Sequence, residues 1–181
     1  MVFLPKVGNP INMKQFRGIV LTSCLGEWYM GCLVLIAQMQ PLPPLYHQVA
    51  IVGYEPEQST EIITGQIQLL CARATEWEYR LRVHILQGDV YKAFDTLQPS
   101  VVARAMEDAG WHPQIIASIL EEDRYLKLFP CFEGVDRDDL EVPCTASVKQ
   151  GGKEATLKWN LVMRWLFSQL IPSWQVRNFG G

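Results

Sequence analysis

The chain has 181 residues, 49% of them hydrophobic and 19% charged, which is enough to bury one sizeable core or two small lobes. Its formal net charge of −3 lacks the basic excess usual in nucleic-acid-binding proteins, although the first eighteen residues carry Lys6, Lys14 and Arg17 and no acid. Five cysteines without a Cys-x-x-Cys pair and three scattered histidines argue against a zinc site and a disulfide partner, and a reducing compartment, cytoplasm or nucleus, is expected.

The N-terminal part of the chain is predicted to form strand and loop, followed by a helix. Turn residues at positions 8–10 divide Met1–Ile19, and a helix is predicted over Leu25–Met39. The stretch Gly18–Ala37 is about as long as a bilayer span. It contains Glu27 and no basic segment like that of a signal peptide precedes it, so we expect a buried strand and a core helix, with no membrane partner.

The clearest predicted helix begins at Ser59 or Thr60, either of which can cap it. Its apolar residues recur in steps of three and four, as one buried face requires, and they are Ile63, Ile67, Leu70, Ala74, Trp77 and Leu81. We therefore expect a core helix. The next run, Val83–Val90, alternates in hydropathy and is predicted to be a strand with Gly88 near its end.

The remaining helices are marked by prolines and by one glycine. One is predicted to begin at Pro99 and to end at Gly110, and another begins at Pro113. The last helix, Ala155–Leu170, is apolar almost all round, which predicts burial from several sides.

Two further strands are predicted between these helices. Tyr125–Phe132 and Asp139–Val148 read as a pair of strands joined by an acidic turn. Strands and helices are mixed without a regular βαβ repeat, so the predicted fold class is α+β.

The segment Gly88–Leu97 reads GDVYKAFDTL and holds the main candidate for chemistry. Mg²⁺ is commonly held by a carboxylate at a strand end, and Asp89 would have that position. Two-metal phosphoryl transfer needs several such oxygen ligands from different strands. From these residues alone, Asp89 is either a metal ligand or, more commonly for such a position, a cap or turn residue.

Four motifs in a fixed order resemble reverse transcriptases of the retroelement type, non-LTR or group II intron-like. Asp-x-x-x-Ala-Phe-Asp, beginning at Asp89, resembles the first catalytic motif of that family. Pro5–Ser23 is similar to the fingers motif P-K-x-G…[YF]-R-P-I-x-L, and Val52–Thr60 to the x-G-F-x-x-x-x-S-T before a long helix. Ala146–Asn160, ASVKQGGKEATLKWN, is similar to R-Q-G-x-x-x-S-P-x-L-F-N. Together the motifs cover nearly the whole chain.

The resemblance implies a fold and an activity. Residues 1–82 would form a fingers-like region, and residues 83–181 a partial palm of a right-hand polymerase. The implied activity is RNA-directed DNA polymerisation, a nucleotidyl transfer assisted by two Mg²⁺ ions. Its partners would be an RNA template, a DNA primer and deoxynucleoside triphosphates.

The resemblance also implies catalytic roles in the segment after residue 88. Asp89 would be a ligand of both metals, together with the backbone carbonyl of Val90. Phe94 would pack under the sugar and disfavour a ribose 2′-hydroxyl. Without the resemblance, Phe94 reads as a core residue, and Asp95 as a cap of the following helix.

Nucleotide-binding roles are implied for both ends of the chain. Lys6 and Arg17 match residues that neutralise the incoming triphosphate. The compact ammonium of a lysine and the planar guanidinium of an arginine are both suited to binding phosphate oxygens. Gln150 and Gly151 would contact the incoming nucleotide and let backbone approach the template pair. Read without the motifs, the two cations are solvated surface residues and the glycines form a turn.

The sequence also departs from the family pattern. Gly18 stands where the family usually has Pro, Glu27 where Lys is common, and Gly152 follows Gln150-Gly151 in place of Ser-Pro. The second catalytic motif, aromatic-Ala-Asp-Asp, does not occur, so we expect that motif and the thumb beyond Gly181, and the chain alone to be an inactive fragment. The alternatives are a non-catalytic remnant that binds RNA or protein and, ranked lower, a small membrane-anchored protein.

Overall fold

The computed structural model describes most of the chain and divides it into two units. The described residues are 1–49, 51, 53, 58–76, 85, 87–124, 127–131, 141–143 and 151–175. Met1–Val49 and Lys92–Gly181 make one compact unit, here called the main unit, and Ala50–Tyr91 makes the inserted unit. The predicted division after residue 82 is not tested by this clustering and stays a prediction.

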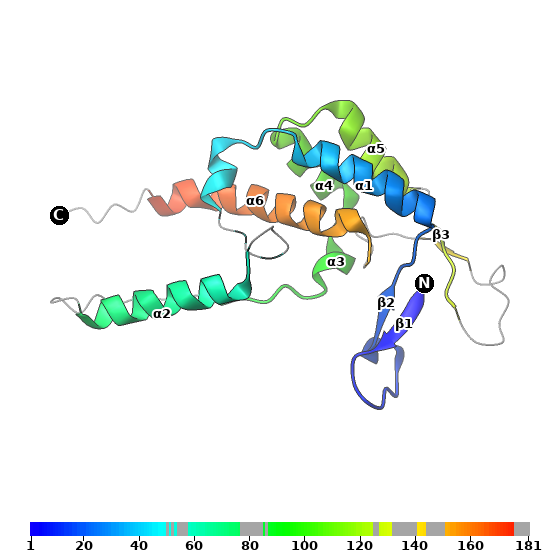
Figure 1. Ribbon diagram of the computed structural model, residues 1–181, viewed down its shortest axis with the longest axis horizontal. Coiled ribbons are helices and arrows are strands. Elements are labelled where there is room, and N and C mark those ends of the chain that lie inside the picture. The colour runs from blue at the N-terminus through cyan, green and yellow to red at the C-terminus, as the bar shows by residue number, and fades with distance from the viewer. Residues whose placement is uncertain are drawn as a thin grey trace. The chain divides into compact units, whose positions relative to one another are not determined.

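Helices and short antiparallel strand pairs are mixed in the described residues, as the α+β prediction requires (Figure 1). The strands are β1 (Val2–Pro5), β2 (Phe16–Ile19), β3 (Lys127–Leu128) and β4 (Val142–Pro143). The α-helices are α1 (Cys24–Gln38), α2 (Thr60–Glu76), α3 (Ala93–Thr96), α4 (Pro99–Asp108), α5 (Pro113–Arg124) and α6 (Lys153–Gln175). Two 3-10 helices are η1 (Met13–Gln15) and η2 (Pro44–Gln48).

A β-hairpin opens the main unit and confirms the predicted strand and loop. Strands β1 and β2 pair antiparallel, with Leu4 opposite Arg17. The pairing extends past the strand, because the backbone N–H of Lys6 donates to the carbonyl of Gln15 at 2.7 Å. In η1, the Gln15 side chain accepts from the backbone N–H of Ile11 at 2.6 Å, which closes the loop between the strands.

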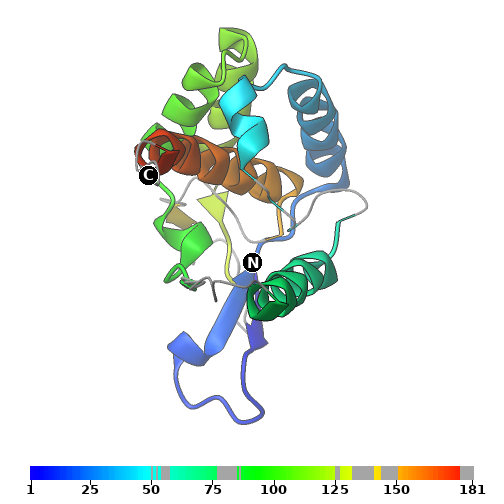
Figure 2. The ribbon, with the colours of Figure 1, turned by 90° about the vertical axis from the view of Figure 1, so that its left-hand side faces the viewer.

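The core of the main unit is built around α6. This helix contacts α1, α4 and η2, while α5 contacts α1 and α4. In Figure 2, α1 (blue) lies above α6 on the right, and α4 and α5 (green) lie above it on the left. The predicted burial of the last helix is confirmed around Ala155, Leu161 and Val162, whereas Leu166 and Leu170 are exposed. The buried apolar cluster comprises Met30, Leu33, Ala37, Tyr46, Leu97, Val102, Ala105, Met106, Ala109, Trp111, Ile116, Ile119, Ala155, Leu161 and Val162.

The helix boundaries follow from local capping. Ser23 caps α1 by accepting from the backbone N–H of Gly26 at 3.1 Å. Helix α4 ends as predicted, because Gly110 has φ +76°. The N–H of Trp111 then donates to the carbonyl of Met106 at 3.1 Å, the long-range bond of a Schellman motif. The Gly18–Ala37 stretch becomes the end of the hairpin and α1, and no helix of the described residues is long and apolar enough to cross a membrane.

The second strand pair is also confirmed, and among the described residues of the predicted strands, 129–131 and 141 have no regular structure. Strands β3 and β4 are antiparallel, with Lys127 opposite Pro143 and Leu128 opposite Val142. The predicted acidic turn lies largely at positions 132–140, outside the described residues.

Two predictions for the inserted unit need correction. Helix α2 is present, but it has no buried residue, and Ile63, Ile67 and Leu70 are about two-fifths exposed. Periodicity identifies which face of a helix is apolar, whereas burial requires a second surface to cover that face. The predicted strand Val83–Val90 is wrong where it is described, because residues 85 and 87–90 have no regular structure; positions 83, 84 and 86 lie outside the described residues.

Candidate functional site

The N-terminal hairpin presents an exposed basic face. Arg17 lies on β2 opposite Leu4, and Lys6 follows β1 opposite Gln15. Side chains alternate along a strand, so Leu4, Lys6 and Arg17 share one face, and all three are exposed. The ammonium of Lys6 also reaches the backbone carbonyl of Lys14 at 3.4 Å. The three cations of the hairpin therefore gather in a stretch of chain that contains no acidic residue before Glu27.

Gly151 brings the second nucleotide-binding motif against the end of this hairpin. Its φ of +106° is rarely adopted by residues with a side chain. A Cβ at this position would lie 2.8 Å from the carbonyl oxygen of Val20 and 3.2 Å from a methyl group of Ile19. Segments far apart in the sequence thus meet backbone to backbone, which only glycine permits. Gln150 lies outside the described residues.

The next glycine lies against a side chain and not against backbone. A Cβ on Gly152 would lie 2.6 Å from a carboxylate oxygen of Glu154, and the Glu154 side chain is fully buried at the start of α6. Lys153 extends along α1, with its ammonium 3.4 Å from the place of a Cβ on Gly31. The Gly-Gly turn therefore fixes the first turn of α6 both to the hairpin and to α1.

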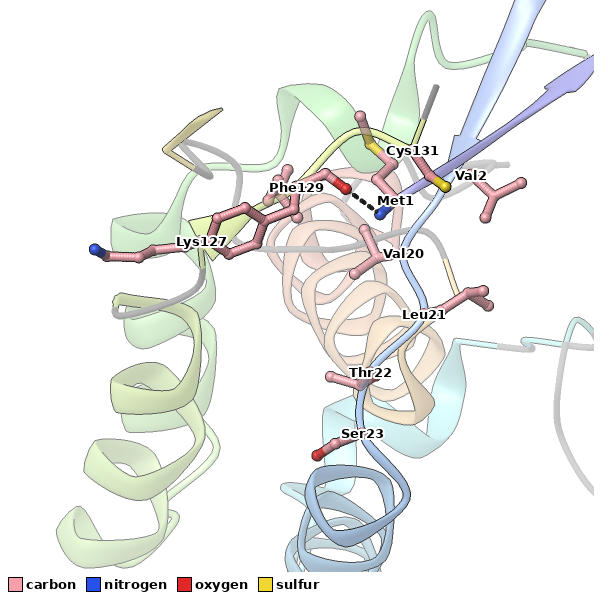
Figure 3. Close-up of a pocket in the computed structure, with 10 residues that line it drawn as sticks. Met1, Val2, Val20, Leu21, Thr22, Ser23, Lys127, Phe129 and Cys131 are labelled. Carbon is pink, nitrogen blue, oxygen red and sulfur yellow. Dashed lines mark hydrogen bonds between the residues drawn. The ribbon is translucent and has the colours of Figure 1, made fainter. Parts of the chain in front are cut away.

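A cavity of about 370 Å³ opens beside this junction. Figure 3 shows the chain from Val20 to Ser23 along one side, and Lys127, Phe129 and Cys131 along another. The Met1 amino group donates to the carbonyl of Phe129 at 2.7 Å and joins the two sides (Figure 3).

Phe94 is directed into the core of the main unit. It lies on the short helix α3, is half-buried, and its ring centroid is 5.8 Å from that of Trp159 with an interplanar angle of 53°. This tilted aromatic pair stabilises the docking of α3 on α6. Packing alone thus accounts for an aromatic residue at this position, and contact with a sugar stays a prediction.

Asp89 and Val90 belong to the inserted unit. Both residues are exposed and lie in a segment without regular secondary structure. Among the described residues, no three His, Cys, Asp or Glu side chains come close enough together to hold a metal ion. The described residues therefore do not form the oxygen-rich cluster that two Mg²⁺ ions need.

Replacing Gly151 with alanine is expected to lower the free energy of unfolding by about 1–3 kcal/mol, the usual magnitude for backbone forced into a disfavoured region. The new Cβ must also displace the Val20 carbonyl. Gly8→Ala is the matched control, because nothing lies within 4 Å of its Cβ. Urea unfolding of the two variants measures the difference. Equal stability would show that the hairpin and the Gly-Gly turn are not in contact.

The predictions from sequence missed a pair of buried charges behind the site. The ammonium of Lys158 on α6 lies 2.5 Å from a carboxylate oxygen of Asp123 on α5, and the two side chains are 0% and 7% exposed. Glu154, also fully buried, precedes Lys158 by one helical turn. The sequence did contain an indication of this pair. Lys158 lies in a predicted helix that is apolar almost all round, and a charge buried in such a helix requires an oppositely charged partner.

A buried tyrosine beside α6 was also missed. Tyr46 is 3% exposed, and its hydroxyl has no hydrogen-bond partner among the described residues. Burial, reinforced by the negative charge of Asp108, raises the pKa of Tyr46 to about 12. Asp108 itself accepts from the indole N–H of Trp165 at 2.5 Å. The guanidinium of Arg164 donates to the carbonyl of Tyr46 at 3.1 Å, so η2 is held on α6 at this point.

Tyr46→Phe is expected to remove part of the alkaline instability of the protein. Because the folded-state pKa is raised from 10.0 to about 12, the native state keeps a proton that the unfolded chain releases. The stabilisation is full below pH 10 and is lost as the pH rises towards 12. Chemical unfolding of both proteins at several pH values tests this. A difference between them that does not change with pH would contradict the assignment.

At neutral pH the same variant is expected to be as stable as the parent, or more stable by up to about 1 kcal/mol. The substitution removes a buried hydroxyl that the described residues leave without a partner, and it keeps the ring in the core. A loss of stability at neutral pH would show that the hydroxyl is hydrogen-bonded in solution.

The described site consists of a basic hairpin face, a glycine contact that joins it to the start of α6, and a cavity beside that contact. The uncompensated positive charge of the hairpin face can attract an anionic ligand. The comparisons add no relative from which a function could be transferred: no family model, curated protein or solved structure matches the chain.

Proposed function

We propose that the chain is a reverse transcriptase-like domain of the retroelement type, in which the β1–β2 hairpin binds the phosphates of a deoxynucleoside triphosphate. The observation that carries this proposal is the close approach of Gly151 to the backbone of Val20. It places the motif-like segment around Gly151 beside the fingers-like segment Pro5–Ser23. Those are the two segments to which the resemblance assigns the incoming nucleotide.

The chemistry of the hairpin fits this role. Lys6 offers a compact ammonium, whereas Arg17 offers a planar fork of donors that matches phosphate oxygens. Both side chains are exposed on one face of the hairpin. The absence of acidic residues before Glu27 leaves their charge uncompensated within the hairpin sequence. A triphosphate would therefore be attracted to this face although the whole chain is acidic.

The remaining roles in the proposal come from the resemblance. Asp89 and the Val90 carbonyl would be ligands of Mg²⁺, Phe94 would contact the sugar, and Gln150 the nucleotide. The partners would be an RNA template and a DNA primer. The described residues do not gather a metal cluster, so catalysis would need further carboxylates, whereas nucleotide binding by the hairpin would not.

Lys6→Ala and Arg17→Ala are each expected to weaken binding of a deoxynucleoside triphosphate roughly 10- to 100-fold, because a hydrogen bond to a charged group contributes about 1.5–3 kcal/mol. Titration calorimetry of the full chain with dTTP measures the affinity. Arg73→Ala removes another exposed guanidinium, which lies on α2 and pairs with Glu76 at 3.2 Å, and it should leave the affinity unchanged. Equal effects of all three variants, or no binding by the parent chain, would refute the proposal.

The basic hairpin also supports a second candidate, a non-catalytic domain that binds RNA. Phosphate contacts would then come from the same Lys6, Lys14 and Arg17, but without selectivity for a triphosphate. Two experiments distinguish the candidates: a primer-extension assay, and competition between RNA and dTTP for binding to the chain. Mg²⁺-dependent extension that is lost in Asp89→Ala establishes the polymerase, whereas RNA binding that dTTP does not displace, with no extension, favours the binding domain.

A further inference from the structure

Helix α1 carries a long apolar stripe on the face opposite its buried one. Its buried residues are Met30, Leu33 and Ala37, which belong to the core. The stripe is made of large apolar side chains and one half-buried cysteine at steps of three and four, namely Leu25, Trp28, Tyr29, Cys32, Leu35, Ile36 and, just past the helix end, Met39. This is the spacing of a coiled-coil seam.

The large side chains of the stripe are strongly exposed. Met39 is 82% exposed, Leu25 74%, Trp28 66% and Leu35 63%. With on the order of 200 Å² per fully exposed large residue, the stripe leaves roughly 700 Å² accessible. A standard protein interface buries about 800 Å² on each partner, so the stripe alone nearly suffices for one. Isolated exposed apolar residues need no explanation, whereas a continuous stripe of this area does.

The charge pattern of α1 favours a protein partner over a lipid surface. The only charged residue of the helix is Glu27, and it accepts a hydrogen bond from the hydroxyl of Thr22. Helices that lie on membranes normally carry Lys or Arg along their polar face, and α1 has neither. The stripe is also rich in Trp, Tyr and Met, the residues enriched at protein interfaces.

We propose that two copies of this chain associate through the α1 stripe, antiparallel about a twofold axis at Cys32. Cys32 is the midpoint of the stripe, so this arrangement places Leu25 opposite Met39 of the other copy. Trp28 then faces Ile36, and Tyr29 faces Leu35. The stripe contains no charged side chain, so no like charges meet in this arrangement. The antiparallel orientation also sets the two helix dipoles in opposite directions. The stripe is thus self-complementary, as a twofold interface requires.

The first test is the mass of the full chain in solution. Sedimentation equilibrium over a wide concentration range should give a reversible dimer. Leu35→Glu should weaken dimerisation roughly 100-fold or more, because it buries a carboxylate in each half of the interface. Ile11→Glu adds the same charge at a residue that is 88% exposed outside the stripe, and it should remain dimeric. Circular dichroism establishes that both variants keep their helices.

The second test uses the native cysteines and does not depend on the folding of a charged variant. A variant that keeps only Cys32 should form a disulfide-linked dimer under mild oxidation, because the two thiols face each other across the axis. A variant that keeps only Cys24, which is exposed at the start of α1, should not, since the antiparallel arrangement separates its thiols.

Several outcomes overturn the proposal. One is a monomer at every concentration, as expected if another part of the same chain covers the stripe. Others are larger aggregates in place of a dimer and a Leu35→Glu variant that stays dimeric. A monomer that floats with lipid vesicles would also overturn the proposal. Cross-linking through Cys24 as efficient as through Cys32 would reject the antiparallel arrangement.

Discussion

Lys158→Ala is expected to lower the free energy of unfolding by about 3–5 kcal/mol, the usual loss when one partner of a buried ion pair is removed. In the folded protein, its ammonium lies 2.5 Å from the carboxylate of Asp123, and neither side chain has appreciable contact with water. The variant leaves that carboxylate buried without this ammonium. It also removes a cation one turn from the buried Glu154. Urea unfolding at neutral pH measures the loss.

Two further variants separate the effect of burial from that of charge. Lys127→Ala breaks the ion pair with Glu141 at 2.9 Å, whose side chains are 62% and 45% exposed, and it should change stability by no more than about 1 kcal/mol. Replacing Lys158 with Met and Asp123 with Leu together should recover most of the loss, because apolar residues of similar volume need no counter-charge. If Lys158→Ala and Lys127→Ala have equal effects, the Lys158–Asp123 pair is exposed to water in solution.

Ile119→Ala is expected to destabilise the protein by about 2–5 kcal/mol, the range measured when large aliphatic side chains are truncated in a core. Ile119 is 0% exposed on α5 and belongs to the same cluster as Val102 and Met106, which are also fully buried. Truncation removes apolar area from the core and leaves a cavity between packed helices. Thermal and urea unfolding monitored by circular dichroism measure the change.

The matched control for this truncation is Ile11→Ala. It removes the same atoms from a side chain that is 88% exposed, so the change should stay within about 0.5 kcal/mol. A small effect of Ile119→Ala, close to that of the control, would show that α5 does not pack against α4 in the native protein.

Much of the helical structure was predictable because its signals are local. Ser23 supplies a capping hydroxyl, Pro99 occupies the first turn of α4, and Gly110 adopts the left-handed conformation that ends it. Each signal acts within a few residues of the chain. For the same reason the strand and loop within Met1–Ile19 were predicted from turn residues, although the antiparallel pairing of β1 with β2 was not.

The predictions that failed concern burial and pairing. Helix α2 has the apolar period of a core helix, yet none of its residues is buried. Alternation in Val83–Val90 predicted a strand, but residues 85 and 87–90 form none. Each pattern shows that one face of the segment is apolar and would be stabilised by burial. Neither pattern identifies the helix or strand that would cover that face.

The candidate site was predictable only in part. Lys6 and Arg17 were named from sequence, and the structure places both on one hairpin face. The contact of Gly151 with Val20 could not be inferred from spacing, because it joins distant parts of the chain. The Lys158–Asp123 pair was missed because the sequence of α6 does not indicate which carboxylate Lys158 meets.

The central position of α6 has a consequence for how the protein folds as it is synthesised. Helix α1, η2 and α4 all pack on α6, yet α6 follows them in the chain. The hairpin and the α4–α5 pair involve neighbouring segments, which can close while the chain is still emerging from the ribosome. The main core, in contrast, stays open until residues 153–175 have been translated. Until then Met30 and Met106 lack a complete covering, and the nascent chain exposes apolar surface that a chaperone could bind.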